Sequence, residues 1–198
     1  MATHTLLRRT CDSRGQSLIE FSILLPFLVM LAFGVSEMGW LLLDQHVVTK
    51  LAREGSNLIS RNTTIQDAET ALGTMSARPV NFGTSSKVIF SVLKKGATTG
   101  TANYDRIFLY QRHEYGAISG VSKLRTSGSG AFGSAPDYIA ANSDNNTGLQ
   151  VTNVASDLIA PRGGMVYVTE IFTTHSLLTP VNRFGIIVPT TLYSIAYF

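Results

Sequence analysis

The chain has 198 residues, of which 44% are hydrophobic and 15% are charged, and its formal net charge is +3. Three of the 16 basic residues and one of the 13 acidic residues precede Gln16, so the rest is nearly neutral and lacks the clustered Lys and Arg that a nucleic-acid-binding surface needs. The single cysteine is Cys11, so no disulfide can stabilise the remainder of the chain.

An almost unbroken apolar run extends from Phe21 to Leu43. At about 1.5 Å per residue it forms a helix ~35 Å long, enough to cross a hydrocarbon core of about 30 Å with some tilt. It is longer than the apolar part of a secretory signal, and no Ala-x-Ala site follows it, which indicates a retained anchor. Because Arg8, Arg9 and Arg14 precede the run, we expect a cytoplasmic N-terminus and an exported C-terminal part.

The helical pattern continues beyond the apolar run. Apolar residues recur at spacings of three and four, as on one face of a helix, so the spanning helix is expected to reach about Ser60. A break at residues 62–64 and a shorter helix over residues 65–76 follow, and Arg78 and Pro79 end that helix. The expected helix partner face consists of Val47, Val48, Leu51 and Leu58.

Four later segments are rich in β-branched and aromatic residues, which predicts strands of a mostly antiparallel sheet. These segments are residues 87–94, 106–113, 165–173 and 191–198. Residues 125–148 hold an excess of Ser, Gly and Asn, which predicts a long mobile loop with a candidate helical turn at residues 138–141. Residues 151–159 fit a strand or a helix equally well.

The start of the apolar run resembles a known family. The sequence RGQSLIEF at residues 14–21 and the later LAREG at residues 51–55 are similar to the N-terminal region of TadE-like proteins, pseudopilins of the tight-adherence (Tad, or Flp) pilus system. Residues 166–198 are similar to the family's ending but are far less specific. The resemblance implies a pilin-like α+β fold, in which a long N-terminal transmembrane helix continues into a small exported domain with an antiparallel sheet of about four strands.

The resemblance also implies proteolytic processing. Tad-type pseudopilins are cut after a glycine by an inner-membrane aspartyl prepilin peptidase, which corresponds here to the bond between Gly15 and Gln16. Glycine lets another backbone approach closely, and a cut before the apolar run leaves the anchor on the mature chain. The alternative is an uncleaved signal anchor.

Glu20 follows that bond closely. If apolar helices pack together in a fibre, an unpaired carboxylate among them costs several kcal/mol unless it meets a cation. We therefore expect Glu20 of one subunit to meet the new amine of Gln16 on a neighbour and to fix the axial register. A glutamate that is simply solvated at the cytoplasmic interface is the alternative.

Two further residues of the run are notable for their depth. Glu37 lies about 9 Å inside the outer end, where it is expected to pair with another helix in the membrane or to bend toward the interface. Trp40 lies at the depth of the aromatic belts that flank membrane spans.

The remaining polar residues do not predict catalysis or metal binding. Ser91, Asp105 and His113 are conceivable hydrolase residues, but no motif connects them. Asp137 and residues 144–146 lack the order of a calcium-binding loop and are typical of turns. We expect no enzymatic activity, no cofactor and no metal.

The expected organisation has three parts: a cleaved basic leader (residues 1–15), a transmembrane helix with its exported continuation (16–61), and an exported α+β head domain (62–198). The resemblance implies a minor pilin or pseudopilin of the bacterial inner membrane, and hence a role in adhesion and biofilm formation. Its implied partners are the prepilin peptidase, other Tad pilins, inner-membrane platform proteins and the lipid bilayer. The alternative is a single-pass envelope protein outside any pilus that binds a partner or surface through its exported domain.

Overall fold

The computed structural model describes residues 14–159, 161–180, 183, 185 and 187–198. Within these residues a long N-terminal helix is followed by a second helix and a four-stranded antiparallel sheet, which confirms the expected α+β class. The expected leader lies outside the described residues apart from residues 14 and 15. In chain order the elements are α1 (Arg14–Ser60), α2 (Ile65–Met75), β1 (Ser86–Lys95), β2 (Ile107–Gly116), the 3-10 turn η1 (Thr147–Leu149), β3 (Met165–Thr174) and β4 (Thr191–Tyr197).

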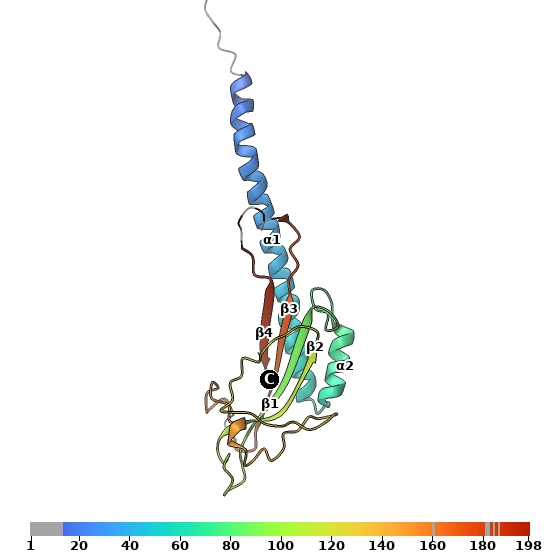
Figure 1. Cartoon of the computed structure of the whole chain (residues 1–198), viewed down its shortest axis with the longest axis vertical. Helices are drawn as coiled ribbons and strands as arrows, with labels where there is room; N and C mark the ends of the chain where they lie inside the picture. The colour runs from blue at the N-terminus through green and yellow to red at the C-terminus, as the bar shows by residue number, and fades with distance from the viewer. Residues whose placement is uncertain (1–13, 160, 181–182, 184, 186) are drawn as a thin grey trace, which may run out of the picture.

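α1 consists of two stretches in different surroundings. Its N-terminal stretch stands clear of the rest of the molecule, and residues 15–32 are all exposed (Figure 1). Its C-terminal stretch lies along the sheet, and its buried residues recur at helical spacings of three, four and seven. They are Glu37, Asp44, Val48, Leu51, Ala52, Gly55, Ser56 and Ile59. α1 therefore stands alone at its N-terminal end and forms a layer of the head at its C-terminal end.

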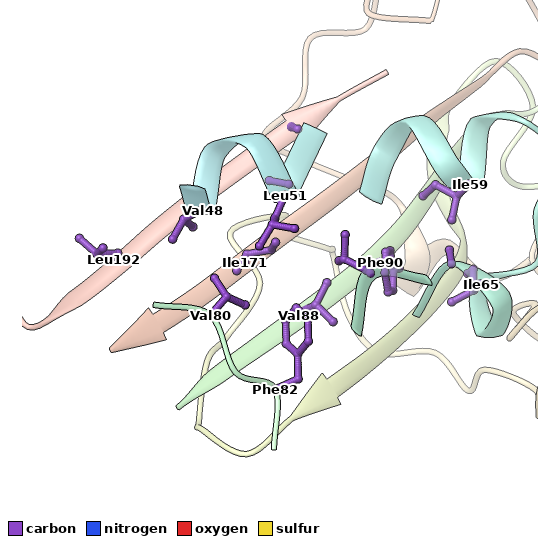
Figure 2. Close-up of a cluster of buried hydrophobic side chains, with 14 of the residues drawn as sticks. Val48, Leu51, Ile59, Ile65, Val80, Phe82, Val88, Phe90, Ile171 and Leu192 are labelled. Carbon is purple, nitrogen blue, oxygen red and sulfur yellow. The ribbon is translucent and has the colours of Figure 1, made fainter. Parts of the chain in front are cut away.

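The strands pair in the order β2-β1-β3-β4, and every pairing is antiparallel. α1 and α2 cover one face of this sheet. Apolar residues from α1, among them Val48 and Leu51, meet Phe90 of β1 and Ile171 of β3 in a buried cluster (Figure 2). This cluster joins the C-terminal stretch of α1 to the sheet as one hydrophobic core.

α2 begins with a capped N-terminus. The Thr64 side chain accepts a hydrogen bond from the backbone N–H of Asp67 at 3.1 Å, which satisfies one of the free donors of the first turn. The helix buries Ile65, Ala68 and Leu72 in the same cluster and ends at Met75, one residue before the expected end.

The chain between β2 and β3 covers the opposite face of the sheet. Its residues Leu124 and Leu149 are buried with Phe108 of β2 and Val168 of β3 in a second core cluster. Between them, Ala140 is buried in the same cluster and Phe132 packs against it, so the long loop expected at residues 125–148 packs on the sheet. The expected helical turn at residues 138–141 is also wrong, since the 3-10 turn lies at Thr147–Leu149.

The strand ends differ from the expected ends by at most three residues, and the starts of β3 and β4 coincide with them. The largest difference is at β2, which continues to Gly116 because that residue still pairs with Lys87 of β1. Residues 151–159 form neither helix nor strand, and Val151 makes only an isolated bridge to Thr126.

Candidate functional site on the N-terminal helix

Gly15, Gln16 and Glu20 occupy the first turns of α1, where all three are exposed. The side-chain amide of Gln16 donates a hydrogen bond to the Glu20 carboxylate at 3.1 Å. A Cβ atom added at Gly15 would meet no atom of the described residues within 4 Å. The packing of this chain therefore does not require a glycine at position 15.

The exposed stretch of α1 presents apolar side chains on all sides. Leu18 is 73% exposed, Phe27 66% and Leu31 65%. Large apolar side chains in such number are unfavourable in water, whereas lipid tails accommodate them. Of the helices that the structure describes, α1 alone is long and apolar enough to cross a membrane. The protein is accordingly a single-pass membrane protein by the character of this helix.

Glu37 is the first deeply buried residue of α1. Its carboxylate accepts hydrogen bonds from the backbone N–H of Leu178 at 3.2 Å, from that of Thr179 at 2.9 Å and from the Thr179 hydroxyl at 2.6 Å. Nε2 of His175 lies 3.3 Å from the same carboxylate. These partners come from the connection between β3 and β4 of the same chain.

His175 joins Glu37 to a second buried carboxylate. Its Nδ1 lies 2.7 Å from Oδ2 of Asp44, while its Nε2 faces Glu37. All three side chains are almost completely buried. We call Glu37, Asp44 and His175 the clamp, because it fastens the β3–β4 connection to α1.

Sequence reasoning singled out Glu37 but missed its partners within the chain. Asp44 follows Glu37 by two helical turns and therefore lies on the same face of α1, which is a local signal. His175 lies 131 residues from Asp44 in the chain. Only the fold brings it to α1, so no local pattern could have identified it.

The expected helix partner face packs against the sheet of its own chain. Val48 and Leu51 are buried in the first core cluster, and Val47 and Leu58 are partly buried against it. The apolar face is therefore used inside the molecule, where it holds the head on α1, and is not free for a second subunit.

The conceivable hydrolase residues are not brought together. His113 faces α2, where its Nε2 lies 2.9 Å from the Glu69 carboxylate. Asp105 bonds to Arg162 at 3.1 Å, and this guanidinium is the main cause that lowers the pKa of the Asp105 carboxyl. Ser91 is fully buried, and its hydroxyl has no partner among the described residues.

The Asn-rich segment forms a turn. The side-chain amide of Asn103 donates to the carbonyl oxygens of Ser143 and Asn146 at 2.6 and 3.0 Å, and its oxygen accepts from Gln150. Asn145 accepts from the backbone N–H of Ala102. Within the part of the chain that the structure describes, no group of three or more His, Cys, Asp or Glu side chains is arranged to hold a metal ion.

Glu170 of β3 is a further buried carboxylate that the sequence did not single out. It accepts hydrogen bonds from the Ser122 hydroxyl, from the backbone N–H of Lys123 at 2.7 Å and from the Tyr193 hydroxyl at 2.7 Å. Burial, together with the bond to Glu170, raises the pKa of Tyr193 well above its usual value. Glu170 thereby attaches the β2–β3 segment to the face of the sheet that lies opposite α1 and α2.

The fold and the helix define a class of protein, namely an α+β head carried on one long apolar N-terminal helix. Residues 15–57 match the family model described as TadE-like protein, which confirms the resemblance over this segment. The matched residues all lie within α1. Comparisons with curated proteins and with solved structures gave no match.

Proposed function

We propose that this protein is a minor pilin or pseudopilin that takes part in the assembly of Tad-type pili, and hence in adhesion and biofilm formation. The observation that carries the proposal is the TadE-like match on a helix whose N-terminal stretch is apolar and free of contacts with the head. TadE-like proteins belong to a pilus system in which subunits are held in a membrane before assembly. A free apolar helix suits both the bilayer and a bundle of helices in a fibre.

In this proposal a prepilin peptidase of the inner membrane removes residues 1–15. The position of Gly15 at the exposed start of α1 supports this step, because its backbone is not covered by the head. After the cut, the amine of Gln16 lies at the N-terminal end of the helix macrodipole, where a positive charge is unfavourable unless an anion is near. Glu20 of a neighbouring subunit supplies that anion and sets the axial register.

The exported head then lies on the outer side of the inner membrane, where other Tad pilins and the inner-membrane platform proteins are its partners. The apolar face of α1 at residues 47–59 is occupied by the head's own sheet. Contacts with neighbouring subunits therefore involve the free stretch of α1 and the outer surface of the head.

The mass of the protein extracted from membranes tests the proposal. We expect loss of residues 1–15 in cells that contain the peptidase and the full mass in cells that lack it. Gly15→Ala should also prevent the cut without disturbing the fold, because a Cβ at this position meets no described atom. Gly39→Ala is the matched control, since that position is equally open and lies outside the cut site. An intact N-terminus in peptidase-containing cells would favour a single-pass envelope protein that does not enter a pilus.

A further inference from the structure

A cavity of about 530 Å³ lies between β2 and the β2–β3 segment, on the face of the sheet opposite α1 and α2. Pockets that bind small ligands typically have volumes of about 300–1,000 Å³. The strand side of the cavity is formed by Lys87 of β1 with Leu109, Arg112 and Glu114 of β2, and residues 120–132 supply most of the other wall. The cavity is therefore large enough for a small organic molecule.

The end of the cavity near Lys87 is basic. Nζ of Lys87 lies 2.7 Å from Oε2 of Glu114, and Nε of Arg112 lies 3.3 Å from Oε1 of the same carboxylate. Lys87 is held in place by a further hydrogen bond to the carbonyl oxygen of Gly120 at 2.8 Å. The Lys87 and Arg112 side chains are each 16% exposed, whereas Glu114 is 42% exposed. Two largely buried cations therefore share one half-exposed carboxylate, which leaves an excess of positive charge.

Two buried polar atoms at this end have no hydrogen-bond partner among the described residues. One is Nε of Arg112, whose contact with Glu114 has the distance but not the direction of a hydrogen bond, and the other is Oγ of Ser91. Ser91 and Arg112 are directly paired between β1 and β2, and Ser91 faces away from α1 because its neighbour Phe90 faces the first core cluster. Both groups can donate a hydrogen bond, so an acceptor is the partner that would satisfy them.

The other end of the cavity is apolar, since Leu109, Phe132 and Leu149 line it. Phe132 is held there through its bridge to Ala140, whose backbone N–H donates to the carbonyl oxygen of Tyr110 at 2.8 Å. Leu109 precedes the basic end by three residues of β2, which corresponds to about 10 Å along a strand. Cations and an apolar surface are therefore separated by roughly the length of a small amphiphilic molecule.

We propose that this cavity binds an organic carboxylate with an apolar body. The carboxylate takes the place of Glu114 between Lys87 and Arg112, and the apolar body lies against Leu109 and Phe132. An arginine can hold a carboxylate by two parallel hydrogen bonds, and the apolar end disfavours an inorganic anion. A small organic acid and the C-terminus of a peptide share this chemistry. The cavity belongs to the head, so binding depends on neither membrane insertion nor pilus assembly.

Isothermal titration calorimetry of the full-length protein in detergent tests this site. The probes are phenylpropionate, its uncharged amide, an apolar pentapeptide with a free C-terminus, and the same peptide with an amidated C-terminus. The amides keep the apolar body and lose the charge. Binding to the micelle is common to all variants of the protein, so differences between variants report the cavity alone.

Arg112→Gln should weaken binding of the carboxylate probes by about tenfold or more, because the bidentate partner is lost. Glu114→Gln should strengthen binding by about threefold or more, because the competing anion is removed. Lys94→Gln is the matched control and should leave binding unchanged. Lys94 is also half-buried on β1, but its ammonium lies on the α1 side of the sheet, 4.8 Å from the centre of the Tyr110 ring.

Tighter binding of the free pentapeptide than of phenylpropionate would assign the carboxylate to a peptide terminus, and the reverse order would assign it to a small acid. Both orders support a carboxylate site. Equal binding of acids and amides, no binding at millimolar concentration, or unchanged binding by Arg112→Gln would overturn the proposal. If circular dichroism shows that Arg112→Gln does not fold, Glu114→Gln decides, since unchanged or weaker binding by that variant contradicts the replacement of Glu114 by the ligand.

Discussion

At the scale of single residues, the clamp shows how one histidine can make two buried carboxylates compatible with a protein interior. Glu37 and Asp44 would repel each other if both were charged and unpaired, and each would lose its hydration. His175 lies between them, and the backbone N–H groups of Leu178 and Thr179 supply further donors to Glu37. The stability of the head around Glu37 and Asp44 therefore depends on a side chain far away in sequence.

His175→Leu should lower the free energy of unfolding by about 3 kcal/mol, because it leaves Glu37 and Asp44 buried without their shared partner. Urea unfolding of the detergent-solubilised protein, followed through the fluorescence of the single tryptophan, Trp40, measures this change. His46→Leu is the control, since His46 lies on the exposed side of α1 and should change stability by less than about 0.5 kcal/mol. Equal stability of the two variants would contradict the importance of the clamp.

Glu20→Ala should reduce recovery of the protein in sheared filaments at least tenfold while membrane insertion is retained. A tenfold loss corresponds to a change of about 1.4 kcal/mol in the free energy of assembly. This change is modest for the loss of a charge pair between packed apolar helices. Ser17→Ala is the control because Ser17 is exposed on the same end of α1. Normal assembly of Glu20→Ala would show that Glu20 does not set the register.

Tyr193 gives the head a dependence on alkaline pH. Its raised pKa means that the unfolded chain releases the phenol proton near pH 10, whereas the folded chain retains it to higher pH. The contribution of Tyr193 to the free energy of unfolding is fully present below the pKa that the phenol has in the unfolded chain. Stability falls as the pH rises above that pKa, because the folded state then binds more protons than the unfolded state. Unfolding measured between pH 8 and 11 should show this decline, and Tyr193→Phe should make it shallower. An unchanged slope would contradict the assignment.

At the scale of elements, the contact between α1 and the sheet depends on one glycine. A Cβ added at Gly55 would lie 2.7 Å from Cγ2 and 2.9 Å from Oγ1 of Thr169 in β3. The helix therefore approaches the sheet at a distance that only glycine permits. By helix propensity alone Gly55 is unfavourable in α1, because glycine costs up to about 1 kcal/mol relative to alanine.

Gly55→Ala should accordingly destabilise the protein by about 1–3 kcal/mol through overpacking, despite its better helix propensity. Gly73→Ala in α2 is the matched control, because a Cβ there meets no described atom within 4 Å and should stabilise by up to about 1 kcal/mol. Thr169→Ala removes both crowded atoms and should restore much of the stability when combined with Gly55→Ala. Thermal unfolding of the four proteins measures these effects, and a stabilising Gly55→Ala would contradict the close approach.

The elements differ in how far their sequences predict them. The helices and strands follow from periodicity and composition, so their ends were predicted within three residues. The β2–β3 segment was misjudged because its Ser, Gly and Asn content favours a free loop, while its few apolar residues, such as Leu124 and Leu149, decide its packing. In the candidate site, Gly15, Gln16 and Glu20 form a local motif, whereas the clamp depends on contacts between distant residues.

At the scale of the whole molecule, the structure separates an exposed apolar stretch of α1 from a packed head. Residues 15–32 are exposed and make no part of either core cluster, whereas residues 48–59 of α1 supply much of the first one. The head therefore consists of the sheet, α2 and the C-terminal stretch of α1, and its boundary does not coincide with the end of that helix.

A chain that begins at residue 33 should fold without a membrane, because it keeps the clamp and both core clusters. A chain that begins at residue 61 should fail to fold, since it lacks Val48, Leu51, Ala52 and Ile59. Far-UV circular dichroism and the dispersion of amide proton signals distinguish the two outcomes. A folded chain from residue 61 would contradict the assignment of α1 to the core.

The course of α1 lengthwise along the sheet also determines how the molecule responds to mechanical force (Figure 1). Tension between the N-terminal end of α1 and the head loads the helix-to-sheet contact in shear, so many side chains must slide at once before the head comes free. The clamp lies at the loaded end of this contact and resists first. Such a subunit can bear tension applied to its helix or to its head without the strands of its sheet separating one after another.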